Sequence, residues 1–333
     1  MSYQRFGTPR IYVDNINWLL ALGKMDTDDL TLAGTGISMA SGSSLKAIFD
    51  LKPSNVQTIS CNSSTNDAKI NIDTTFGTDS DVDNNFIAIL GHNFKDATTK
   101  FKIQISDNSN FSSSTTPNPT VVVNGSAASG FVTPPNNGWT LITYSGTSAN
   151  RYLKITFDDT TGAGFGADIK IGAIMVGEYI DLPQSPDLQL TKRFTFDGLK
   201  KNISTGGQTY GNATFLTGAN WYLAPFQLGT TSNADPIKKS GRTELDLDFS
   251  FLTDTDVFPE KLYSRSDIIA GNDFTTNIIS KTHGGLLPML LQYDNSVTEG
   301  QDSFLWCRLN NEPNFQQVAP NVYSTTINLI EEL

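Results

Sequence analysis

The chain has 333 residues, of which 38% are hydrophobic and 17% are charged, and its net charge at neutral pH is −11. The length corresponds to about two domains of ordinary size. The acidity argues against nucleic-acid and membrane partners, because binding to phosphates or anionic lipids depends on lysine and arginine.

The N-terminal residues are expected to form an arm that carries a short helix. Asp14 predicts the N-cap of a helix over residues 15–22, and Gly23 predicts its end. We assign residues 1–40 to this arm, which either covers the end of a sandwich or docks on a neighbouring molecule. No segment has the ~20 apolar residues of a membrane span, and the start of the chain lacks the apolar core of a signal peptide. We therefore expect synthesis in the cytoplasm.

From about residue 45 the hydrophobic pattern has a period of two. Apolar and polar residues alternate over residues 101–105, 153–157 and 169–171, as in strands with one buried face. The continuous apolar run at residues 86–90 predicts a central strand buried on both faces. No helical pattern separates these strands, which favours an antiparallel sandwich over residues 41–183.

A proline-containing segment at residues 181–187 predicts a domain boundary. Pro183 and Pro186 stop helices and central strands and favour extended backbone. Strand patterns resume beyond it, at residues 245–251, 304–309 and 322–330. Residues 184–333 are therefore predicted to form a second β-rich domain, and the fold class is all-β with two sandwich or barrel-like domains.

Residues that support catalysis are scarce. The two histidines, His92 and His283, have no recognisable nucleophile motif near them. Cys61 and Cys307 are too few to form a disulfide framework and are expected to be buried thiols. We predict that the protein is not an enzyme and needs no cofactor. A glycosidase with paired carboxylates is the weakest of the hypotheses, since the sequence cannot place two carboxylates across a cleft.

Three alternating carboxylates, Asp79, Asp81 and Asp83, are candidate calcium ligands, because such spacing can direct several oxygens at one ion. An EF-hand is excluded, since Asn84 stands where that loop needs glycine and Leu90 where it needs glutamate. Two interpretations stand: a calcium site at the edge of a sandwich, and a solvated acidic turn.

Trp139 and Trp221 are candidate carbohydrate-binding residues. Flat aromatic rings stack on sugar faces, and both tryptophans lie near asparagines that could bind hydroxyl groups. The alternative for each is a core residue at the start of a strand.

The order of several segments resembles a known family. These segments are Phe-Ile-Ala-Ile-Leu-Gly-His-Asn-Phe at 86–94, Asn-Gly-Trp-Thr-Leu at 137–141, and the strands at 151–157 and 171–179. Together with the ends of the chain, at 8–14 and 322–332, they resemble minor virion and tail proteins of tailed bacteriophages that carry a jelly-roll, galactose-binding-like domain. The resemblance implies a jelly-roll in the first domain and carries over no catalytic residue.

The function that this resemblance implies is structural. We expect a tail or tail-tip adaptor protein, located in the virion, that assembles in symmetric copies with itself and with other virion proteins. A capsid decoration protein is a variant of this hypothesis. The alternative from another class is a module that recognises carbohydrate on the host surface.

Overall fold

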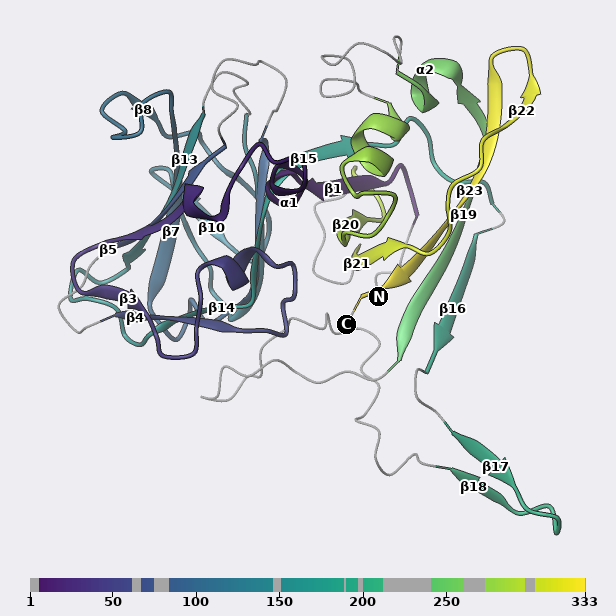
Figure 1. The fold of residues 1–333 in the computed structure, drawn as a ribbon, viewed down its shortest axis with the longest axis horizontal. Coiled ribbons are helices and arrows are strands. Elements are labelled where there is room, and N and C mark those ends of the chain that lie inside the picture. The colour runs from purple at the N-terminus through teal and green to yellow at the C-terminus, as the bar shows by residue number, and fades with distance from the viewer. Residues whose placement is uncertain are drawn as a thin grey trace.

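The computed structural model describes residues 6–61, 67–74, 84–145, 151–188, 190–196, 200–211, 241–259, 273–296 and 303–332. This part of the chain consists mostly of antiparallel strands with a few short helices, which confirms the all-β prediction. Two β-rich halves lie side by side (Figure 1).

The first half is a jelly-roll-like sandwich of two sheets. One sheet contains, in spatial order, β10 (Ser126–Ala128), β11 (Phe131–Thr133), β7 (Thr99–Ser106), β13 (Tyr152–Asp159), β5 (Asp67–Asp73) and β2 (Leu30–Ala33), with β8 (Ser114–Thr115) beside β7. The facing strands are β15 (Ala173–Asp181), β6 (Phe86–His92), β12 (Gly138–Thr143) and β9 (Thr120–Val123). A small third sheet contains β14 (Ile169–Ile171), β4 (Gln57–Cys61) and β3 (Ile37–Met39).

The core of this sandwich follows from the alternation in its strands. Apolar residues of β7 and β13 point inward and meet the inner face of β6 and β15. Every residue of β6 is buried, which confirms the prediction of a central strand covered on both faces. The alternating strands predicted at 101–105, 153–157 and 169–171 are confirmed as well.

The helix α1 (Asn15–Ala21) begins where the sequence predicts. Asp14 is its N-cap and accepts a hydrogen bond from the backbone N–H of Asn17 at 2.8 Å. Ile16, Trp18 and Leu19 are buried in the core of the first sandwich. Of the two placements expected for the helix, the structure therefore has it covering the sandwich.

In the described ranges, the second half contains six strands of one sheet and two short helical segments. Its strands are, in spatial order, β16 (Thr191–Thr195), β19 (Arg242–Thr253), β23 (Val322–Glu331), β21 (Phe304–Leu309) and β20 (Met289–Gln292), with β22 (Gln316–Ala319) beside β23. The helix α2 (Asp254–Val257) and the π-helical segment Thr275–Ser280 cover one face through Val257 and Ile278. A separate hairpin of β17 (Lys201–Ile203) and β18 (Thr209–Gly211) projects from this half (Figure 1).

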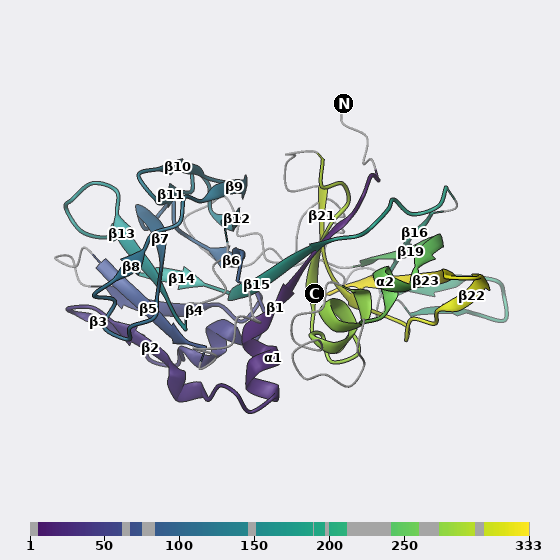
Figure 2. The same ribbon diagram turned by 90° about the horizontal axis from the view of Figure 1, so that it is seen from above.

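One strand joins the two halves into a continuous sheet. The strand β1 (Arg10–Asp14) pairs with β15 on one side and with β20 on the other, so that Tyr12 lies opposite both Tyr179 and Leu290. Figure 2 shows β1 and β15 running between the two lobes. The sheet thus extends through both predicted domains, 41–183 and 184–333. One of its central strands, β1, comes from residues 1–40, which the sequence analysis interprets as an arm.

Alternation explains how β1 fits this position. Ile11 and Val13 face the core of the second half, whereas Tyr12 belongs to an aromatic cluster on the other face of the sheet. At the start of β1, the Arg10 guanidinium donates two hydrogen bonds to the Asp181 carboxylate, at 2.6 and 2.9 Å. All these side chains therefore have partners on neighbouring strands.

Candidate functional site

A polar groove of about 650 Å³ lies on the sheet of the second half. Its lining is dominated by hydroxyl, amide and carboxylate side chains. The lining residues are Asp187, Asp248, Phe249, Ser250, Asn311, Asn314, Gln316, Ser324, Thr325 and Thr326. Neither histidine and no lysine or arginine is among them.

The floor of the groove belongs to β19 and β23, whose alternating patterns set its chemistry. In β19, Leu245, Leu247 and Phe249 are buried in the core, so the intervening acidic residues face outward. The register places Asp248 opposite Thr326. Thr326 donates a hydrogen bond from its hydroxyl to the Asp248 carboxylate, as expected for an outward-facing cross-strand pair.

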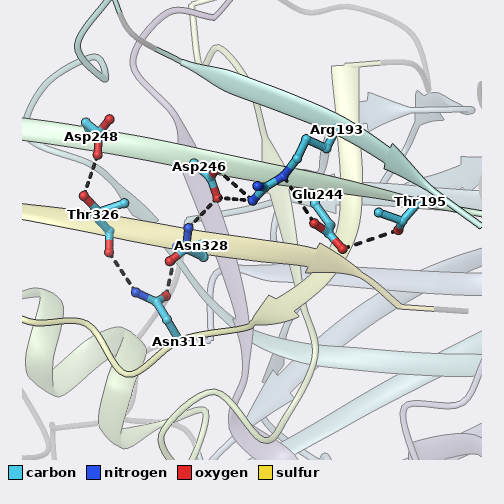
Figure 3. Close-up of polar contacts among 8 residues, drawn as sticks. All are labelled: Arg193, Thr195, Glu244, Asp246, Asp248, Asn311, Thr326 and Asn328. Atoms are coloured by element: carbon cyan, nitrogen blue, oxygen red, sulfur yellow. Dashed lines mark hydrogen bonds and ion pairs between the residues drawn. The ribbon is translucent and has the colours of Figure 1, made fainter. Parts of the chain in front are cut away.

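A chain of polar contacts continues from the groove toward the edge strand β16 (Figure 3). Asn328 donates to Asp246, which lies opposite it, and Arg193 donates to both oxygens of Asp246 at 2.9 and 3.2 Å. The Arg193 guanidinium also lies 3.4 Å from a Glu244 oxygen. Arg193 thus compensates the negative charges of Asp246 and Glu244, which lie on the outer face of the sheet beyond the groove. Because its side chain is 55% exposed, these ion pairs add little stability.

Asn311 builds the groove wall on the β23 edge. The strand β21 leaves β23 after Leu309, and pairing resumes only with β22. Between the two, the Asn311 amide donates to the backbone oxygen of Thr326 at 3.0 Å and accepts from the backbone N–H of Asn328 at 2.9 Å. The side chain therefore takes the place of a neighbouring strand, and Asn311 and Asn314, which lie between β21 and β22, line the groove on this side.

The opposite wall carries Asp187. Its backbone N–H donates to the backbone oxygen of Asp248 at 2.8 Å, and its carboxylate accepts from the Ser250 hydroxyl. Ser250 and Phe251 together face the single residue Ser324, which makes a β-bulge at the end of the groove. Phe251 is 72% exposed there.

The groove is acidic and rich in hydrogen-bonding groups. Within the described ranges, the structure records no ion pair for Asp187 or Asp248. In this part of the chain, their carboxylates accept hydrogen bonds from the side-chain hydroxyls of Ser250 and Thr326. Carboxylate and amide oxygens accept hydrogen bonds, and Asn and Gln amides also donate them. The arrangement can therefore bind ammonium groups or polyhydroxylated ligands.

The tryptophan candidates lie apart from this groove. Trp139 is fully buried on β12, where its ring meets Phe304 edge-on at 5.3 Å. The structure thus places it in the core, the alternative that the sequence left open, and its ring offers no face for a sugar. Trp221 lies outside the described residues, as do the calcium candidates Asp79, Asp81 and Asp83. Among the described residues there is no cluster of three or more His, Cys, Asp and Glu side chains suited to a metal.

The two histidines have different surroundings. His92 is completely buried, is stacked on Phe94 at 4.2 Å, and has its Nε2 2.8 Å from the Thr140 hydroxyl. Burial lowers its pKa to about 3, so the ring is neutral at physiological pH. His283 is exposed in a turn with a left-handed backbone (φ 52°). Neither histidine is near the groove in sequence, and neither lines it.

The comparisons with known proteins do not assign the chain to a family. No protein-family model and no curated protein matches the chain. Among solved structures, the chain is similar to chitosan-binding module 1 derived from the chitosanase/glucanase of Paenibacillus sp. IK-5, with 17% sequence identity and a TM-score of 0.31. The match covers 45% of this chain and 96% of the module. No helix in the described ranges is long and apolar enough to cross a membrane.

Sequence reasoning missed the groove. The alternation at residues 244–250 predicts the strand, but the sequence could not place its carboxylates across a cleft. The usable signal was the run of Asn, Gln, Ser and Thr at residues 310–326, which contributes six of the ten lining residues.

Proposed function

We propose that the protein is a structural component of a tailed-bacteriophage virion, a tail or tail-tip adaptor that assembles in symmetric copies with itself and with other virion proteins. The observation that carries this proposal is the β17–β18 hairpin. All six of its strand residues are exposed, and it projects from the body of the molecule (Figure 1). An isolated two-stranded hairpin is marginally stable in water, so we infer that it is completed by another molecule.

The continuous sheet also supports an assembly role. Both halves share backbone hydrogen bonds through β1, which resists independent movement of the halves. A connector between neighbouring parts of a particle needs such rigidity and needs no catalytic group. The sequence segments at 86–94 and 171–179, which resemble virion and tail proteins, supply the assignment to a phage particle.

Particles produced with and without the gene test this proposal. We expect mass spectrometry to detect the chain in purified wild-type particles at a fixed copy number. Without the gene, electron microscopy should show tails that are absent or incomplete. Normal tails would contradict the tail assignment, and heads that lose a surface layer while tails stay normal would favour the decoration variant.

The groove favours a second candidate function, recognition of a carbohydrate on the host surface. Its amides, hydroxyls and carboxylates match the hydroxyl pattern of a sugar. The exposed ring of Phe251 follows Ser250 at the bulge and is the candidate for stacking. A glycan array with the purified protein tests this function.

Binding that falls on substitution of Phe251→Ala or Gln316→Ala, and not of the exposed Leu286→Ala, would support carbohydrate recognition by the groove. An array without any bound glycan at high protein concentration would dispose of the hypothesis.

A further inference from the structure

The β17–β18 hairpin is a well-formed element whose six strand residues are all exposed. Its register pairs Lys201 with Gly211 and Ile203 with Thr209, and its turn is closed by the backbone N–H of Ser204 on the oxygen of Gln208 at 2.9 Å. Ile203 and Tyr210 are 66% and 57% exposed. The hairpin therefore presents two large apolar side chains to the surroundings, which favours contact with another surface.

The charge of the hairpin is opposite to that of the whole molecule. Residues 200–211 contain Lys200 and Lys201 and no carboxylate, whereas the chain as a whole carries −11. Two copies of so acidic a protein repel one another unless a local positive element meets a local negative one. The hairpin is such a positive element, and it projects furthest from the rest of the second half (Figure 1).

The groove supplies the complementary surface. Asp187 and Asp248 both line it, and in the part of the chain that the structure describes their recorded side-chain partners are neutral hydroxyls. Asn311, Asn314 and Gln316 form the wall on the β23 edge. Among the groove-lining residues, Gln316 lies on β22 and Ser324 on the neighbouring part of β23. In Figure 1, β22 lies at the opposite end of this half from the hairpin of the same copy, which lies below β16.

We propose that the β17–β18 hairpin of one copy docks into the polar groove of a second copy, with Lys201 facing Asp187 and Asp248. This inference rests on the assembly role proposed above and names the partner of the groove. Because hairpin and groove are different surfaces, the contact is head-to-tail. Such a contact makes a ring where the rotation closes and a filament where it does not.

Light scattering and sedimentation velocity over a range of protein and salt concentrations test the contact. We expect the wild-type protein to associate at low salt and to dissociate as salt screens the charges. The double variant K200E/K201E should weaken association by roughly tenfold or more, because it places like charges in contact. D187K alone should weaken it too, and D187K combined with K200E/K201E should restore part of it.

The matched control is K52E/K95E, which makes the same change in net charge at two exposed lysines of the first half. Circular dichroism and thermal unfolding verify that each variant is folded. A wild-type protein that stays monomeric at every concentration, or a K200E/K201E variant that associates like K52E/K95E, would overturn the inference. A glycan that occupies the groove without changing association would overturn it as well.

The inference and the proposed function fail separately. If mass spectrometry finds the chain in the particle while charge reversal leaves association unchanged, the docking contact is wrong and the virion role stands. If particles lack the chain while charge reversal and its rescue behave as expected, the virion role is wrong and the contact stands.

Discussion

Asp14 joins a helix to a sheet through one buried carboxylate. One of its oxygens accepts hydrogen bonds from the backbone and side chain of Asn17, at 2.8 and 2.7 Å, and the other accepts from the backbone N–H of Val176 at 3.1 Å. The residue is 1% exposed. Burial raises its pKa from the ordinary 3.8 to about 6, against the opposing effect of these hydrogen bonds.

This shift predicts a pH dependence of stability with a definite sign. Between about pH 4 and pH 6 the unfolded chain has released the Asp14 proton and the folded chain keeps it. The contribution of Asp14 is therefore fully present below pH 4, and it falls by about 1.4 kcal/mol per pH unit as the pH rises to about 6. Because the opposite contribution of His92 is common to both proteins, Asp14→Asn should gain stability relative to wild type as the pH rises from 4 to 6, measured by urea unfolding at both pH values. A difference between variant and wild type that stays the same at both pH values would refute the assignment.

His92 predicts the opposite slope. Burial holds its folded pKa near 3, below the ordinary 6.5, so the unfolded chain binds the proton first as the pH falls. Its contribution is present above about pH 6.5, and it is lost by about 1.4 kcal/mol per pH unit toward pH 3. His92→Gln removes this contribution, so the variant should gain stability relative to wild type as the pH falls from 6 to 4, measured by urea unfolding at both pH values. If the difference between wild type and variant is the same at both pH values, His92 does not carry the effect.

The elements that could be predicted from sequence are those with a local pattern. Residues 101–105, 153–157 and 245–251 alternate in polarity, and each is a strand. The helix after Asp14 was likewise predictable from its cap. The position of β1 was not, since its pairing with residues 177–181 and 290–292 depends on contacts far apart in sequence. The groove depends on the point at which β21 stops pairing with β23, and no local sequence pattern marks that point.

A substitution of Asn311 tests whether its side chain stabilises the groove wall through the backbone of β23. Asn311→Ala removes two hydrogen bonds to the backbone of β23 and leaves the Thr326 oxygen and the Asn328 N–H without this partner. We expect a loss of about 1–3 kcal/mol in the free energy of unfolding, measured with urea. Asn314→Ala is the matched control, because Asn314 lines the same groove and is exposed. Equal losses in both variants would show that the amide does not replace a strand.

The whole molecule is organised by the sheet that passes through β1. The structure has two β-rich halves, as the sequence predicts, but the hydrogen bonds of β1 link them without interruption. Such a link predicts that the halves unfold together. Apolar residues support it from both sides, because Ile11 and Val13 lie in the core of the second half while the following helix lies in that of the first.

Gly177 is where this link can be weakened. It lies opposite Asp14, and a Cβ there would stand 1.9 Å from the backbone oxygen of Val13. Gly177→Ala must therefore push β1 away from β15, at a cost of about 1–3 kcal/mol. We expect hydrogen exchange to show an equal loss of protection in β13 of the first half and β23 of the second. Gly206→Ala, whose added Cβ has its nearest neighbour at 3.9 Å, should change neither. A loss confined to β13 would mean that the halves unfold independently, and that the boundary predicted near residue 183 separates two cooperative units despite the shared sheet.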